Sequence, residues 1–199
     1  MNLETAKAIL LPIHAAVGLA ALCLGFMALR ARKERGRHTR LGGAFVALML
    51  VAIAVSVPVM VLSRNVFLGG LGMVALYLTV MGWRIGKLRP PQGVATRLDQ
   101  AFIALSLALF SGFVAFGLWV VSRGQVLGLA ASGIGYLGAH SAWSHSRFLA
   151  DPEGAEGSWM THHGGALGGA FIASTTAFFA AVLTSVFPSS PRSWSGSRP

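Results

Sequence analysis

Histidine and aspartate side chains that could support chemistry gather near the ends of the apolar segments of this chain. His140 and His145 lie near the end of one apolar segment, and His162 and His163 open the next one. Asp99 stands at the start of an earlier segment. Ionisable groups inside membrane helices are costly and mark functional sites by default. These residues therefore form the candidate site, provided that the helices bring them together.

Two or three imidazoles with a carboxylate are a suitable ligand set for a transition metal, zinc especially. We predict metal ligation by His140, His145 and His163, with Asp99 in a catalytic role as general base or as a further ligand. With one coordination position open, zinc would lower the pKa of its bound water and support hydrolysis. The sequence has no His-Glu-x-x-His motif. A structural polar network and solvated interfacial histidines therefore stay open as alternatives.

The remaining histidines receive other roles. We expect His38 and His162 to be accessory to the polar centre. His14 lies near the outer end of the first segment. At a rise of 1.5 Å per residue, its depth in the membrane should differ from that of His140 by about 15 Å. That difference disfavours a haem held by His14 and His140, but a haem held by the other histidines stays open. For His14 we favour a buried imidazole bonded to a neighbouring helix.

Six stretches of the chain are long and apolar enough to cross a bilayer. The chain is 54% hydrophobic and only 11% charged, whereas soluble domains carry about 25% charged residues. Runs of 18 or more apolar residues are typical of membrane helices. We predict an all-α integral membrane six-helix bundle in one domain, 1–187, with a disordered tail, 188–199. The expected helices are 8–29, 42–62, 66–86, 99–121, 125–146 and 163–187.

Basic residues alternate between the connections and predict the orientation. The first and third connections are rich in Arg and Lys, whereas the second and fourth carry only Arg64 and Arg123. This positive-inside pattern puts the odd connections in the cytoplasm and both termini on the outer side of a bacterial inner membrane. The basic residues of the two rich connections are Arg30, Arg32, Lys33, Arg35, Arg37, Arg40, Arg84, Lys87, Arg89 and Arg97.

The distribution of basic residues indicates the partners of the chain, and its first residues indicate whether the first segment is retained. The formal net charge is +10, but its concentration in membrane connections indicates attraction to anionic lipid at the cytoplasmic face rather than nucleic-acid binding. The start Met-Asn-Leu-Glu has no basic region, so we expect the first segment to be retained as a helix. Cys23 is the single cysteine, and an internal disulfide is therefore excluded.

Small residues are concentrated in the last two segments. Gly164 and Gly168, like Gly165 and Gly169, form small-xxx-small pairs that let helix backbones approach closely. We expect tight packing of 125–146 against 163–187. The alternative is that these glycines leave room for a ligand or for a second copy of the chain, as a homodimer or in a larger membrane complex.

Two motifs resemble a known family. The stretch His38-Thr39-Arg40-Leu41-Gly42 is similar to a His-Arg-Arg-Leu-Gly opening. The stretch from His163 to Phe178 is similar to His-Leu-Gly-Arg-Met followed by Gly-Ala-Tyr-Ile-Ala-Ala and Thr-Ala-Phe. Both resemble the bacterial multi-pass membrane proteins catalogued as domain of unknown function 2306. The resemblance implies that His38, Asp99 and His163 are family-like polar sites. The Arg-Met of the pattern is Ala166-Leu167 in this chain, and the family lends no activity.

Three classes of function follow from these patterns. The first is a metal-dependent membrane enzyme that acts on a lipid or small amphiphile near the inner leaflet. The second is a haem-binding electron-transfer protein, which requires histidines paired on facing helices. The third is a structural or assembly subunit without a cofactor, in which the histidines do not converge and the glycine faces form an interface.

Overall fold

The computed structural model is all-α, as the sequence predicts. It describes residues 3–32, 36–64, 66–89, 93–151 and 158–186. The predicted disordered tail and the middle of the last connection, 152–157, lie outside these residues. The described residues form six helices: α1 Leu3–Arg30, α2 Arg37–Ser63, α3 Val66–Leu88, α4 Arg97–Ser122, α5 Leu127–Ala150 and α6 Trp159–Val186.

Most of the helices extend beyond the apolar segments that predict them. Helix α2 begins at Arg37 rather than at residue 42, so His38 lies in its first turn and not in a connection. Helix α4 begins at Arg97 because Thr96 caps it, with its hydroxyl accepting from the backbone of Asp99. Apolar composition marks the part of a helix that lipid or core can cover, whereas the helix itself ends where capping ends it.

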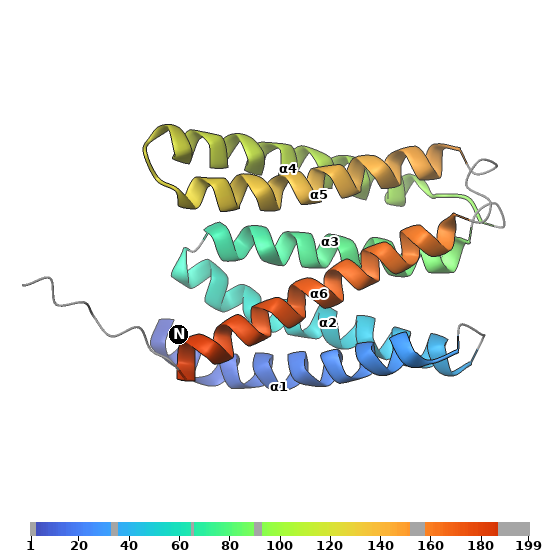
Figure 1. The fold of residues 1–199 in the computed structure, drawn as a ribbon, viewed down its shortest axis with the longest axis horizontal. Helices are drawn as coiled ribbons and strands as arrows, with labels where there is room; N and C mark the ends of the chain where they lie inside the picture. Colours follow the sequence, from blue (N-terminus) through green and yellow to red (C-terminus); the bar gives the residue numbers. More distant parts are fainter. Residues whose placement is uncertain (1–2, 33–35, 65, 90–92, 152–157, 187–199) are drawn as a thin grey trace, which may run out of the picture.

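The helices form two antiparallel pairs with α3 between them (Figure 1). Helix α1 packs along α2 and α4 packs along α5, while α3 contacts α2, α4, α5 and α6. Helix α6 crosses α3 obliquely and reaches α1 at its far end. In the middle of α6, the ring of Phe171 meets the ring of Phe45 on α2, and Gly25 on α1 leaves space for it. Helix α3 is therefore the centre of the bundle.

Glycines permit close helix contacts at two places in the bundle, between α4 and α5 and between α3 and α6. On α4 and α5, Gly117, Gly128 and Gly135 face the backbone of the opposite helix so closely that an added methyl group would overlap it. On α3, Gly82 and Gly86 receive side chains of α6, and the ring of His163 lies over Gly86. Small residues allow such contacts where lipid supplies no hydrophobic drive for helix association.

The expected tight packing of the fifth helix on the sixth is wrong. Helices α5 and α6 make no extensive contact in the part of the chain that the structure describes. A Cβ atom added at Gly164, Gly165 or Gly168 would have no neighbour within 4 Å. Both helices dock on α3 instead. These three glycines of α6 therefore border open space, which agrees with the alternative that they leave room for a ligand or a partner.

The outer surface of the bundle is apolar. Large hydrophobic side chains such as Leu105, Leu118 and Ile172 are more than half exposed. Helices α1, α2, α3 and α4 are each long and apolar enough to cross a membrane, and this composition indicates a membrane protein. Within the described residues, α5 and α6 are not among the helices that meet these requirements of length and apolar composition. Both carry histidines, and α5 carries several serines as well.

The α4–α5 contact generates a test of the fold. We expect Gly135→Ala to lower the thermal stability of the purified protein, because its Cβ would meet the α4 backbone at 2.7 Å from the Val114 nitrogen. Overpacking of this kind costs about 1–3 kcal/mol. Gly133→Ala is the matched control, since nothing lies within 4 Å of its Cβ. Equal melting temperatures for the two variants would contradict the α4–α5 packing.

Candidate functional site

Three histidines connect neighbouring helices through backbone carbonyls. The Nδ1 atom of His14 on α1 lies 2.9 Å from the Ala52 carbonyl oxygen of α2. His38 on α2 makes the same contact with Ala28 of α1 at 2.9 Å. A carbonyl oxygen only accepts, so Nδ1 donates in each pair and is the protonated nitrogen of a neutral ring. The expected bond of His14 to a helix is confirmed, but the residue is half-buried rather than buried.

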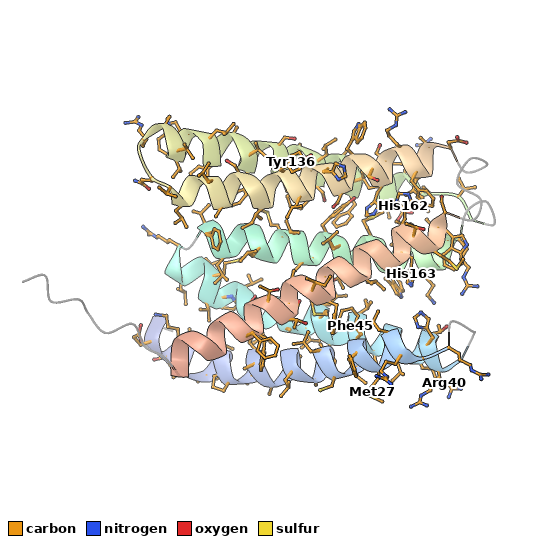
Figure 2. The ribbon with its side chains drawn as sticks, viewed as in Figure 1. Met27, Arg40, Phe45, Tyr136, His162 and His163 are labelled. Carbon is orange, nitrogen blue, oxygen red and sulfur yellow. The ribbon has the colours of Figure 1, made fainter. Side chains whose placement is uncertain are left out.

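His163 joins α6 to α3 in the same manner. Its Nδ1 donates to the Gly82 carbonyl oxygen at 2.8 Å, and its ring lies over Gly86. Figure 2 shows His162 and His163 at the same end of α6. The ring centroid of His163 is 6.4 Å from that of His38 on α2. Two of the residues singled out by the family resemblance therefore lie side by side, although 125 positions separate them in the chain.

His145 has a different kind of partner. It is 4% exposed, and its Nδ1 lies 2.9 Å from the hydroxyl of Tyr77 on α3, which is 1% exposed. Tyr77 packs against the rings of Phe102 and Phe110. Its hydroxyl has no other acceptor among the described residues, so we assign it as the donor and Nδ1 as the acceptor. The Nε2 atom of the neutral His145 ring then carries the proton.

His162 completes an aromatic stack between α5 and α6. Its ring stacks on that of Phe148, with the two planes 26° apart and the centroids 4.1 Å apart. It also meets the ring of His145 edge-on at 5.8 Å. This stack is the place where α6 approaches the polar face of α5, and it separates two hollows.

The two hollows together are named the α5–α6 cleft. The inner hollow, of about 190 Å³, has Leu78 of α3 in its wall, and the end hollow, of about 440 Å³, includes Arg147 and Asp151. Ser144 and His162 line both hollows. The polar residues of the inner hollow are His140, Ser141, Ser144, His145, Thr161 and His162.

Asp99 is engaged by two neighbouring residues. Arg84 on α3 binds it with two parallel hydrogen bonds, from Nε to Oδ1 at 2.7 Å and from Nη2 to Oδ2 at 2.6 Å. The backbone nitrogen and the hydroxyl of Thr96 also donate to Oδ2. A bidentate ion pair together with a capping box fixes the start of α4 against α3. These partners account for the buried carboxylate without a catalytic role.

The structure distributes the predicted metal ligands over different surroundings. His140 and His145 line the inner hollow, whereas His163 lies against α3, and Arg84 and Thr96 hold Asp99. In the described ranges, no group of three or more His, Cys, Asp and Glu side chains is placed to hold a metal ion. The metal assignment stays a prediction, and the convergence on which it depends is not formed by these residues.

Sequence reasoning missed the partners of these groups. Tyr77 is a polar residue within an apolar helix, and only its position in space identifies it as the partner of His145. Arg84 was assigned to the orientation signal alone, but it binds Asp99. The spacing Thr96-x-x-Asp99 is a recognisable capping signature, and it could have predicted the start of α4.

Comparison with protein-family models, curated proteins and solved structures gives no match for this chain. The resemblance to domain of unknown function 2306 therefore stays a prediction, and the functional argument depends on the geometry of the site.

The Arg84–Asp99 pair generates a test of its structural role. We expect Asp99→Ala to destabilise the protein by about 1.5–3 kcal/mol, because it leaves the partly exposed guanidinium without its carboxylate. Arg84→Ala should cause a similar loss, and the double variant should lose much less than the sum. The measurement is thermal unfolding in detergent of the wild type and the three variants. Strictly additive losses would show that the pair is not coupled.

Proposed function

We propose that this chain is a six-span protein of a bacterial inner membrane with both termini on the outer side. Successive helices run antiparallel, so their ends alternate between two faces of the bundle (Figure 1). One face carries most of the described basic residues, and the positive-inside rule makes it the cytoplasmic face. Those residues are Arg30, Arg32, Arg37, Arg40, Arg84, Lys87, Arg89, Arg97 and Arg147.

Pairs of an aromatic ring and a cation support the same placement. At the basic face, Lys87 lies over Trp83, Arg89 over Trp159 and Arg147 over Trp143. Tryptophans at membrane interfaces anchor helices, and long cationic side chains extend from there towards the headgroups. Because Trp143 belongs to α5 and Trp159 to α6, this band includes the two helices whose composition is less apolar. It therefore supports six spans rather than four.

Within this protein, the α5–α6 cleft is the functional site, and its role is to bind a small amphiphile that arrives through the membrane. The observation that carries this proposal is His145. Its ring is buried, its Nδ1 is engaged by Tyr77, and its Nε2 has no hydrogen-bond partner in the described part of the chain, although the residue lines the inner hollow. An acceptor group of a ligand in the hollow would give this nitrogen a hydrogen-bond partner.

The open space between α5 and α6 is consistent with a ligand that comes from the bilayer. These helices dock on α3 rather than on each other, and the glycines of α6 border the gap. A site between helices with a few convergent polar groups is typical of small-molecule binding. The metal-dependent enzyme is the less supported alternative, because the described residues do not gather three ligands. No contact in these residues favours a haem.

Orientation can be tested by cysteine labelling. In a Cys23→Ala background, we expect Gln125→Cys, between α4 and α5, to react with a membrane-impermeant maleimide in intact spheroplasts. Val94→Cys, between α3 and α4 and 72% exposed, should react only after lysis. Gln125 is also exposed, so access to reagent is matched. The opposite labelling pattern would invert the proposed topology.

The cleft itself can be tested with two adjacent glycines. Both Gly164 and Gly165 have room for a larger side chain, but only Gly165 lines the inner hollow. We expect mass spectrometry of solvent extracts to find an amphiphile bound to the purified wild type and to Gly164→Leu, and to find it depleted in Gly165→Leu. The leucine would occupy the hollow without a packing clash. Equal recovery from the two variants, or none from the wild type, would contradict a binding role for the cleft.

A further inference from the structure

We propose that the amphiphile bound in the α5–α6 cleft is a carboxylate, a molecule with a hydrocarbon part and an anionic acceptor head. This inference rests on the proposed function of the cleft as an amphiphile site. It adds the chemical class of the ligand, which follows from the hydrogen-bond polarity of the inner hollow and from the apolar residues in its wall.

Tyr77 sets the polarity at the buried end of the hollow. Its hydroxyl donates to Nδ1 of His145, so the opposite ring nitrogen, Nε2, carries a hydrogen and can only donate. Tyr77 and His145 are both almost fully buried, so solvent does not compete for this bond. The group that meets His145 in the hollow must therefore be a hydrogen-bond acceptor.

The rest of the polar lining also suits an acceptor. The hydroxyls of Ser141, Ser144 and Thr161 have no hydrogen-bond partner among the described residues, and each can donate to a ligand. The inner hollow contains no described Asp or Glu side chain that could receive a cationic head. The end hollow adds the guanidinium of Arg147, with Asp151 in the same wall. A carboxylate offers two acceptor oxygens, and charged acceptors form the stronger hydrogen bonds.

Apolar residues complete the wall of the inner hollow. Leu78 of α3 and Gly165 and Ala166 of α6 lie there beside the polar residues. Gly168, one turn further along α6 than Gly165, has no neighbour for a Cβ atom. The hydrocarbon part of the ligand would lie against this apolar wall.

The test compares ligands that share a hydrocarbon chain but differ in the head group, and ligands that share a carboxylate head but differ in the chain. Wild-type protein in phosphatidylcholine nanodiscs is dialysed against radiolabelled dodecanoate, dodecanol, dodecylammonium and acetate, and empty nanodiscs are used to subtract partition into lipid. We expect dodecanoate to bind at least about tenfold more tightly than dodecanol or dodecylammonium, because a hydrogen bond to a charged group is worth about a factor of ten or more. Acetate should not bind measurably.

Each alternative binding result would contradict one part of the proposal. Equal binding of dodecanol and dodecanoate would overturn the carboxylate and leave the amphiphile site intact. Preference for dodecylammonium would reverse the assigned polarity. Acetate binding as tight as dodecanoate would show that the apolar wall of the hollow does not hold a hydrocarbon chain. If no probe binds, the proposed function of the cleft fails together with this inference.

Variants of Tyr77 and His145 distinguish a role in hydrogen-bond polarity from a purely structural role. Tyr77→Phe keeps the ring between Phe102 and Phe110 but removes the hydroxyl that fixes the His145 proton. We expect it to weaken dodecanoate binding several-fold and to leave dodecanol binding unchanged, because only the acceptor head depends on that proton. A purely structural role of Tyr77 would weaken both probes equally. His145→Phe should abolish the preference for dodecanoate, and retention of that preference would overturn the assignment.

Discussion

Polar contacts of α3 with three other helices hold the candidate site together. Arg84 binds Asp99 of α4, Tyr77 binds His145 of α5, and the Gly82 carbonyl accepts from His163 of α6. In an apolar solvent the hydrophobic effect does not draw helices together, so hydrogen bonds and close contacts at small residues determine which faces meet. Each of these contacts has its partner on a different helix, and α3 is therefore surrounded.

The cleft is a consequence of this central position. Helix α5 bonds the Tyr77 hydroxyl of α3, and α6 bonds the Gly82 carbonyl of α3. Among the described residues, α5 and α6 approach each other where His162 stacks on Phe148. Gly164, Gly165 and Gly168 of α6 have no neighbour for a Cβ atom, whereas the glycines of α5 that pack do so on α4. Glycine-rich segments thus both permit close helix contact and border open space.

The partner of each imidazole determines what its second nitrogen can do. His14, His38 and His163 donate through Nδ1 to carbonyl oxygens, so a neutral ring carries its lone pair on Nε2. His145 accepts from a tyrosine, so its Nε2 carries a hydrogen instead. Histidines that look equivalent in the sequence therefore differ in the hydrogen-bonding role of Nε2, which is an acceptor in the first group and a donor in His145. This difference favours recognition of an acceptor over metal ligation at His145.

The sequence by itself determined the all-α class, the number and order of the helices, and the gathering of five histidines and Asp99 at one end. Hydropathy and helix length are properties of consecutive residues, so a single chain is enough to read them. Only the tertiary structure decided that Tyr77 and Arg84 are partners of those groups, that His163 faces α3 and that α5 and α6 stand apart. Glycine pairs permit a close approach, but they do not determine which helix approaches. Tyr77 and His145 are 68 positions apart, so their hydrogen bond cannot be predicted from the spacing of neighbouring residues.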